Sequence, residues 1–258
     1  MTDPVSRTIL LLDIEKYSDR DDVEQAYLRR MLYDITDRAL ESADIDETLR
    51  LRADRGDSVM ELIDANASVH ALLRALLGEV PAQLRAVNRM ASSSAQIRLR
   101  AVLATGYVAV DELDGWVGSD LNHACRLLDG DVLRAALRER TNDFALCISE
   151  DVHAGIVRHD RPGVPADQFH PVTVASKNGP LRAWLHGPVP AGTDDHCERG
   201  TGQQAPAPRN TGPAFTFNGG SPSFGGSLVG GDQHGVSGGT VHGDVRLGGT
   251  DARHGEDA

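Results

Sequence analysis

Residues 7–18 read RTILLLDIEKYS, and this stretch decides how the start of the chain folds. Four consecutive aliphatic residues, at 9–12, lack helical spacing and predict a central strand that is buried on both faces. Asp13 follows directly, and a carboxylate there is costly unless a cation or a helix N-terminus compensates for its charge. Asp57 has a similar setting in RADRGDSVMELI. A helix-capping or surface aspartate is the alternative interpretation of Asp13.

The composition excludes several classes of protein. The 258 residues carry a formal net charge of −12, which argues against binding to nucleic-acid backbones or anionic membranes. The apolar runs are shorter than the roughly 20 residues of a membrane span, and MTDPVSR lacks the apolar core of a signal peptide. Cys125, Cys147 and Cys197 have no metal-ligand spacing and form no even disulfide framework. A cytoplasmic protein is expected.

The order of the predicted elements indicates an α+β fold. Strands are expected at 9–12, 48–53, 59–63, 97–105, 107–111, 144–149, 169–174 and 181–186, and helices at 23–40, 66–90, 121–137 and 150–158. We expect the helix at 66–90 to be interrupted near Pro81, and the strand at 107–111 to return antiparallel across Gly106. This order predicts a sandwich built on a ferredoxin-like unit.

The composition changes near residue 187, and most of the 27 glycines lie beyond it. We therefore expect one domain at 1–186 and a disordered Gly-rich tail at 187–258. Residues 221–250 place isolated Val and Leu among Gly, Gln, His and Thr, which favours either a plain linker or a segment that assembles as cross-β. This stretch resembles the short amyloid-signalling motifs that are loosely related to the RIP homotypic interaction motif.

Asp13 and Asp57 end and begin strands that we expect to be neighbours, so their carboxylates can converge. Two carboxylates in one cavity repel each other unless a cation lies between them. Hard, oxygen-preferring Mg²⁺ or Mn²⁺ suits such a pair, particularly when substrate phosphates complete the coordination shell. The sequence places no His or Cys near either aspartate to favour zinc.

Two further polar groups lie in GWVGSDLNHACRLLD, at 115–129. Asn122 and Arg126 are four residues apart and hence on one helix face, where they can orient a ribose and neutralise charge on a phosphate. A surface Arg126 paired with Asp129 or Asp120 is the alternative. Lys177, in a Ser-Lys-Asn-Gly turn, is either a phosphate contact or an ordinary turn lysine.

Taken in order, these parts resemble the class III nucleotidyl cyclases over residues 7–186. The matching parts are Asp-Ile-x-x-Tyr-Ser after a strand, Gly-Asp-Ser before one, Gly-x-x-Leu-Asn-x-Ala-x-Arg on a helix, and a Lys before Leu-x-x-Trp-Leu. The resemblance implies the ferredoxin-like sandwich of that family. It also implies the conversion of a nucleoside triphosphate to a 3′,5′-cyclic monophosphate and pyrophosphate.

By this resemblance, Asp13, Ile14 and Asp57 would bind two divalent metal ions, Mg²⁺ or Mn²⁺. These ions would activate the ribose 3′-hydroxyl and neutralise the triphosphate. Asn122 would orient the ribose, and Arg126 would stabilise charge on the α-phosphoryl group.

The resemblance gives substrate contacts to three more residues, Tyr17, Ser18 and Lys177, with Lys177 near the terminal phosphates. In the family, each site is built across a dimer interface, with metal ligands from one chain and Asn and Arg from the other. A homodimer with two equivalent sites is therefore implied.

The sequence departs from the family at the two positions that specify the base, which here are Ala53 and Gly115. Neither side chain can form hydrogen bonds to a base edge. Four interpretations stay open: Arg52, Arg55 or Trp116 reads the base, the base is a pyrimidine, the pocket is permissive, or the pocket is inactive.

The leading hypothesis is a cytosolic homodimeric nucleotidyl cyclase for intracellular signalling, with a tail that recruits it to an assembly. Its substrate would be a nucleoside triphosphate of unassigned base. The rival hypothesis is a binding or adaptor module of the same fold without turnover, acting through its tail.

Overall fold

The computed structural model describes residues 3–113, 115–176 and 179–191, and the backbone of four short strands between residues 215 and 247. The chain divides into two units, 1–198 and 199–258. The helices and strands of the first unit are β1 (Val5–Ile14), α1 (Asp22–Glu41), β2 (Arg50–Asp54), β3 (Ser58–Asp64), α2 (Val69–Met90), β4 (Leu99–Val110), β5 (Trp116–Val117), α3 (Ser119–Leu128), α4 (Asp131–Glu139), β6 (Phe144–Ser149), α5 (Glu150–Gly155), β7 (Phe169–Val174) and β8 (Leu181–His186). None of the helices in these described residues is long and apolar enough to cross a membrane.

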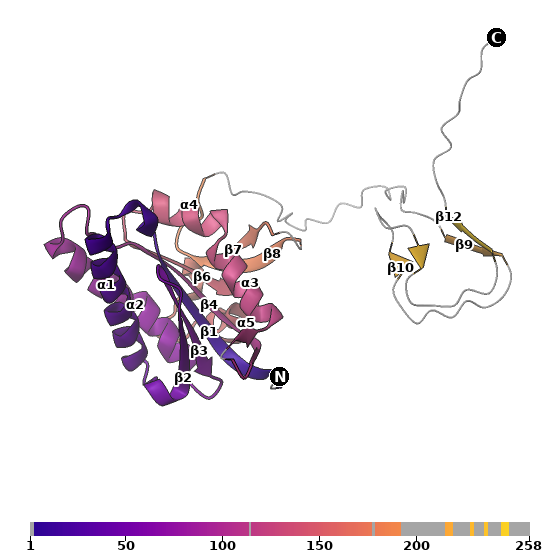
Figure 1. Ribbon diagram of the computed structural model, residues 1–258, viewed down its shortest axis with the longest axis horizontal. Coiled ribbons are helices and arrows are strands. Elements are labelled where there is room, and N and C mark those ends of the chain that lie inside the picture. Colours follow the sequence, from indigo (N-terminus) through magenta and orange to yellow (C-terminus); the bar gives the residue numbers. More distant parts are fainter. Residues whose placement is uncertain are drawn as a thin grey trace, which may run out of the picture. The chain divides into compact units, whose positions relative to one another are not determined.

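One sheet organises the first unit, in the strand order β2-β3-β1-β4-β6-β8-β7, with β5 paired to β4. Strand β1 is antiparallel to both β3 and β4, and β2 is antiparallel to β3. The first four strands and the two helices that connect them thus form the predicted ferredoxin-like unit. Figure 1 shows α1 and α2 on one side of the sheet and α3 and α4 on the other.

The alternation of side chains along β1 produces a core on each face of the sheet. Leu10 and Leu12 pack in the core that α1 and α2 cover, whereas Ile9 and Leu11 pack in the core that α3 and α4 cover. Burial of each of these side chains contributes about 1.5–3 kcal/mol to folding, so β1 is held from both sides. Asp13 continues the row of Ile9 and Leu11 and therefore faces α3.

Several predicted boundaries are confirmed. The strands at 144–149, 169–174 and 181–186 match β6, β7 and β8 residue for residue. Helix α1 begins after Asp21, whose carboxylate accepts the Glu24 N–H at 2.8 Å in a capping box. Strands β2 and β3, predicted at 48–53 and 59–63, pair as an antiparallel hairpin.

The predicted turn at Gly106 is wrong, because β4 continues through it and pairs with β1 from Leu99 to Val108. Gly106 instead allows α3 to lie close to β4. A Cβ at position 106 would lie 2.2 Å from the Cβ of Asp120 on α3. The Asp120 carboxylate also accepts the Tyr107 N–H at 2.8 Å. Gly106 therefore lets the first turn of α3 contact the sheet.

Three predicted helices differ in detail. Residues 121–137 form two helices, α3 and α4, separated at Gly130, where a Cβ would lie 2.7 Å from Val174 Cγ1 of β7. The close packing there needs a glycine between the helices. Helix α2 is continuous through Pro81, because its buried leucines hold it on the sheet despite the missing N–H. Helix α5 ends at Gly155, and a separate 3₁₀ turn spans 157–159.

In the second unit, β9 (Phe215–Asn218) pairs antiparallel with β12 (Asp244–Leu247), and β10 (Leu228–Val229) pairs with β11 (Gly235–Val236). The other residues of 192–258 lie outside the described part of the chain. The predicted boundary at 186, the disordered tail and the cross-β segment at 221–250 therefore stay predictions.

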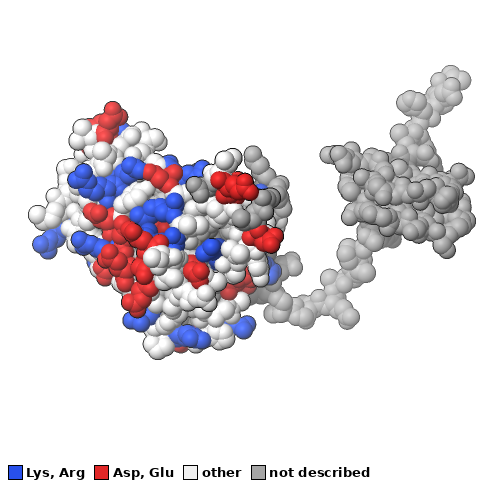
Figure 2. All heavy atoms as spheres, turned by 60° about the horizontal axis from the view of Figure 1, so that its bottom comes forward, with Lys and Arg blue, Asp and Glu red and all other residues white. Residues whose placement is uncertain are grey.

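On the face drawn in Figure 2, acidic and basic side chains lie side by side in small groups. Neither sign covers the described surface in this view. A continuous basic surface, which nucleic-acid backbones require, is not present on that face.

Candidate active site

Asp13 and Asp57 open onto one cavity of about 360 Å³. Asp13 lies opposite Ser58 in the β1–β3 pairing, and the Ile14 N–H donates to the Asp57 carbonyl at 3.0 Å. The end of β1 and the start of β3 are therefore fixed next to each other. The convergence inferred from the order of the strands is present in the structure.

The cavity lies between the end of β1, the β2–β3 hairpin and the second half of α3. Its lining residues are Leu11, Asp13, Arg55, Asp57, Ser58, Met60, Cys125, Leu128 and Asp129. Asp129 was considered above only as a partner for Arg126. Its spacing of four residues from Cys125, which also lines the cavity, places both near one face at the end of α3, and this spacing is the signal that could have revealed it.

The burial of Asp13 makes its charge costly. Its side chain is 12% exposed and forms an ion pair with Arg100, its cross-strand neighbour on β4. Burial raises the pKa of Asp13 to about 6, although the charge of Arg100 and its hydrogen bond oppose this shift. The negative charges of Asp57 and Asp129 raise it further. The sequence reasoning missed Arg100, because only the register of β4 places it beside Asp13.

A rigid turn positions Asp57, which is exposed to solvent. Gly56 has φ +85°, a left-handed conformation that favours glycine. Its N–H donates to the Asp54 carboxylate at 2.8 Å, and Asp54 is also ion-paired with Arg29 of α1. The hairpin tip is thus anchored to a helix before any ligand binds.

These residues fit a hard divalent cation whose shell is completed by a substrate. Among the described residues, no group of three or more His, Cys, Asp or Glu could hold a metal ion by itself. Two carboxylates plus phosphate and water oxygens are the usual Mg²⁺ environment. Burial raises the pKa of the Cys125 thiol, which disfavours the thiolate that zinc prefers. Ile14 could contribute only its backbone, because its side chain is buried on the opposite face.

Asn122 and Arg126 lie on α3 but do not line the cavity of their own chain. Asn122 is exposed and Arg126 is half-buried. The alternative pairing of Arg126 is not observed, because Asp120 accepts a backbone N–H of β4 and Asp129 is 3.3 Å from Arg134. In the described part of the chain, the Arg126 guanidinium has no ion pair.

Tyr17 and Ser18, two of the three further predicted substrate contacts, do not line the cavity. Tyr17 and Ser18 form a short 3₁₀ turn after β1. The Tyr17 side chain packs against the core under α1 and α2, on the face opposite to Asp13, while Ser18 is exposed. Lys177 lies outside the described residues.

The two base-specifying positions have small residues for different structural reasons. Ala53 packs against the core under α3 and α4. At Gly115, a Cβ would lie 2.5 Å from Asp111 Oδ2, and the Gly115 N–H donates to Asp111 Oδ1 at 2.7 Å. A side chain at 115 would therefore disturb this turn. Of the alternatives, Trp116 packs against the same core, and Arg55 lines the cavity.

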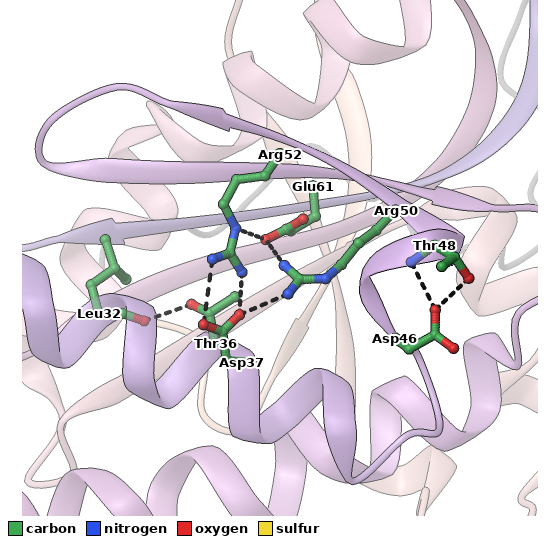
Figure 3. Close-up of polar contacts among 8 residues, drawn as sticks. All are labelled: Leu32, Thr36, Asp37, Asp46, Thr48, Arg50, Arg52 and Glu61. Carbon is green, nitrogen blue, oxygen red and sulfur yellow. Dashed lines mark hydrogen bonds and ion pairs between the residues drawn. The ribbon is translucent and has the colours of Figure 1, made fainter.

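Arg52 is excluded as a base reader by its contacts, which lie on the α1 face of the sheet (Figure 3). Its guanidinium donates to Glu61 and Asp37. Arg50 donates to the same two carboxylates, at 2.9 Å and 3.0 Å. Tyr33 covers Arg52, with its ring centroid 4.8 Å from the guanidinium carbon. This network holds β2 and β3 to α1.

Comparison with known proteins clarifies the fold. No protein-family model and no curated protein matches the chain. The solved structure of the guanylyl cyclase Cya2 is 16% identical and has a TM-score of 0.51, over 74% of this chain and 95% of that one. An adenylate/guanylate cyclase/hydrolase from Silicibacter pomeroyi is 20% identical with a TM-score of 0.50, over 72% and 98%. A bacterial light-regulated adenylyl cyclase is 16% identical with a TM-score of 0.51, over 71% of this chain and 52% of that one.

The fold is that of cyclase catalytic domains. The fold expected from the sequence resemblance is thus confirmed. At identities of 16–20%, the likeness extends to the fold, and the chemistry of the site must be argued from this chain's own residues.

Proposed function

We propose that the protein is a nucleotidyl cyclase, which converts a nucleoside triphosphate to a 3′,5′-cyclic nucleotide and pyrophosphate. The observation that carries this proposal is the shared cavity of Asp13 and Asp57. Adenylyl and guanylyl cyclases have the same fold. In the reaction, the ribose 3′-oxygen forms a bond to the α-phosphorus and loses its proton to solvent. The bond between the α-phosphorus and the bridging oxygen breaks, and pyrophosphate leaves.

Asp13 and Asp57 would hold Mg²⁺ or Mn²⁺, two ions per site, together with the backbone of Ile14. When bound, these ions would lower the pKa of the ribose 3′-hydroxyl and compensate for the charge of the triphosphate. The excess negative charge around Asp13 supports this assignment, because a cation would relieve the repulsion that raises its pKa.

Asn122 would orient the ribose and Arg126 would stabilise the charge that develops on the α-phosphoryl group. Because both side chains lie away from the cavity of their own chain, we assign them to the cavity of a second copy in a homodimer. Ser18 and Lys177, with the backbone of Tyr17, would complete the contacts to the nucleotide.

The first test is turnover. Purified protein is incubated with Mn²⁺ or Mg²⁺ and each of the four nucleoside triphosphates, and cyclic product and pyrophosphate are separated by chromatography. Asp57→Asn is expected to lower kcat/KM by at least about 100-fold, because a charge that holds the metal ions is lost. Asp34→Asn, on the exposed side of α1, removes the same charge and should leave kcat/KM unchanged. No product from the wild type rejects the proposal.

The second test asks whether each active site is built from one chain or from two. Asp57→Asn and Arg126→Ala should each be inactive alone. Mixed and refolded together, they should regain about a quarter of the wild-type activity, since half of the dimers are mixed and each has one intact site. Failure to regain activity would reject the shared site.

A rival function is a nucleotide-binding adaptor without turnover, acting in intracellular signalling through tail-mediated assembly. The small residues Ala53 and Gly115 favour it, because neither can read a base. Nucleotide binding without cyclic product would support the rival. A peptide of residues 221–250 that forms dye-binding fibres would support the assembly, and one that stays soluble at high concentration would reject it.

A further inference from the structure

Arg55 is a cation in a cavity whose other charged residues are acidic. Asp13, Asp57 and Asp129 line the same cavity. Among the described residues, the guanidinium of Arg55 has no ion pair or hydrogen bond. This distinguishes it from Arg100, which is bound to Asp13. A guanidinium near three carboxylates but paired with none is available to an incoming anion.

The side chain of Arg55 acts across the cavity toward α3. Burial raises the pKa of the Cys125 thiol, and the positive charge of Arg55 opposes this shift. Cys125 lines the α3 side of the cavity, whereas Arg55 comes from the β2–β3 hairpin. The positive charge of Arg55 thus acts on a residue of α3, across the cavity that both residues line.

The backbone of Arg55 is held in place before any ligand binds. Its N–H donates to the Ser58 carbonyl at 2.9 Å, which closes the hairpin tip. The neighbouring Asp54 accepts the Gly56 N–H and is ion-paired with Arg29 of α1. A preformed turn reduces the entropy lost when the side chain binds a ligand.

We propose that Arg55 binds the polyphosphate chain of the nucleotide whose metal ions Asp13 and Asp57 hold. This inference rests on the proposed function, because it takes a metal-bound nucleoside triphosphate as the ligand. A planar guanidinium forms two parallel hydrogen bonds to phosphate oxygens. Arg55 lines this cavity beside the two carboxylates that would hold the metal ions, whereas Ala53 and Gly115 do not line it.

The test measures binding of inorganic tripolyphosphate with Mg²⁺ to the full chain by isothermal titration calorimetry. Arg55→Gln should weaken binding by about tenfold or more, because a charge-assisted hydrogen bond is lost. Arg55→Lys, which keeps the charge but loses the planar fork, should give an intermediate loss. Arg138→Gln removes the same charge from the exposed end of α4 and should not change the affinity. Equal melting temperatures would show that the variants are folded.

The outcomes separate this inference from the cyclase proposal. If the wild type binds tripolyphosphate through Arg55 but forms no cyclic nucleotide, the inference holds and the cyclase proposal fails. Equal tripolyphosphate affinities for the wild type and Arg55→Gln would overturn the inference, whatever the turnover. Absence of binding by the wild type would overturn it as well. So would a changed preference among the four nucleotides with an unchanged tripolyphosphate affinity, because Arg55 would then read the base.

Discussion

Glu61 and Asp13 are carboxylates on neighbouring strands of one sheet, but they lie on opposite faces and have different partners. Glu61, on the α1 face, is fully buried and receives hydrogen bonds from both Arg50 and Arg52. Asp13, on the α3 face, is slightly exposed and is paired with Arg100 alone. One carboxylate connects structural elements, and the other opens onto a cavity.

The balance of charge separates the two regions more clearly than burial does. Around Glu61, two arginines face two carboxylates, the second being Asp37. Three carboxylates line the cavity beside Asp13: Arg100 pairs with Asp13 and Arg134 with Asp129, whereas Asp57 has no ion pair among the described residues. A balanced buried network needs no further ion, whereas an excess of acid leaves an unfavourable field that a cation can relieve. A carboxylate without enough partners is thus the better candidate for a ligand site.

The largest effect on stability is expected at Glu61. Glu61→Ala would leave Arg50 and Arg52 buried without this carboxylate and should lower the free energy of unfolding by about 3–5 kcal/mol. Urea denaturation measures the loss. Glu61→Gln keeps an acceptor and should cost less, and a loss below about 1 kcal/mol for Glu61→Ala would contradict the structural role given to the network.

The next largest effect is the pH dependence that Asp13 imposes. Its pKa is about 6 in the folded chain and about 3.8 ordinarily. Between these values the folded state binds more protons than the unfolded state, so the free energy of unfolding falls as pH rises. The fall is at most about 3 kcal/mol, from about two pKa units. Asp13→Asn cannot titrate and should lack this component.

Urea denaturation of the wild type and Asp13→Asn between pH 4 and pH 7, in the presence of a chelator, measures the difference. Other titrating groups contribute equally to both proteins, so the gap between the two curves isolates Asp13. Parallel curves would show that the pKa of Asp13 is not raised in the folded chain. The support that this raised pKa gives to a cation site would then be lost.

The sequence predicted the elements of the fold well where one segment alone carries the signal. Residues 7–18 identified the central strand, and the order of strands placed Asp13 and Asp57 together. What depends on register was missed. Arg100 lies beside Asp13, and Arg52 beside Glu61, only because particular residues pair across strands.

Close packing between distant segments was also beyond the sequence. Nothing in the sequence alone distinguishes Gly106 and Gly130 from glycines that form turns. Gly106 instead leaves room for Asp120 of α3 against the sheet, and Gly130 leaves room for Val174 of β7 beside the helices. Asn122 and Arg126 both lie on α3 as their spacing predicted, and their joint action on a nucleotide stays a prediction.

The packing of α3 against β4 gives the third prediction. Gly106→Ala should lower the free energy of unfolding by about 1–3 kcal/mol, because its Cβ would overlap the stem of Asp120. Gly78→Ala is a matched control in α2, where an added Cβ meets nothing within 4 Å. It should raise stability by about 0.5–1 kcal/mol through helix propensity. Equal effects at the two glycines would contradict the close approach of α3.

The smallest effect on stability is expected at Asp57, and it tests the comparison most directly. Asp57 is exposed, and no ion pair of its side chain occurs among the described residues. Asp57→Asn should therefore change the free energy of unfolding by no more than about 0.5 kcal/mol at pH 7 in a chelator. The same substitution should abolish the metal-dependent binding of tripolyphosphate. A loss of stability as large as that of Glu61→Ala would make Asp57 a structural acid, because a ligand group without protein partners has nothing to lose when its charge is removed.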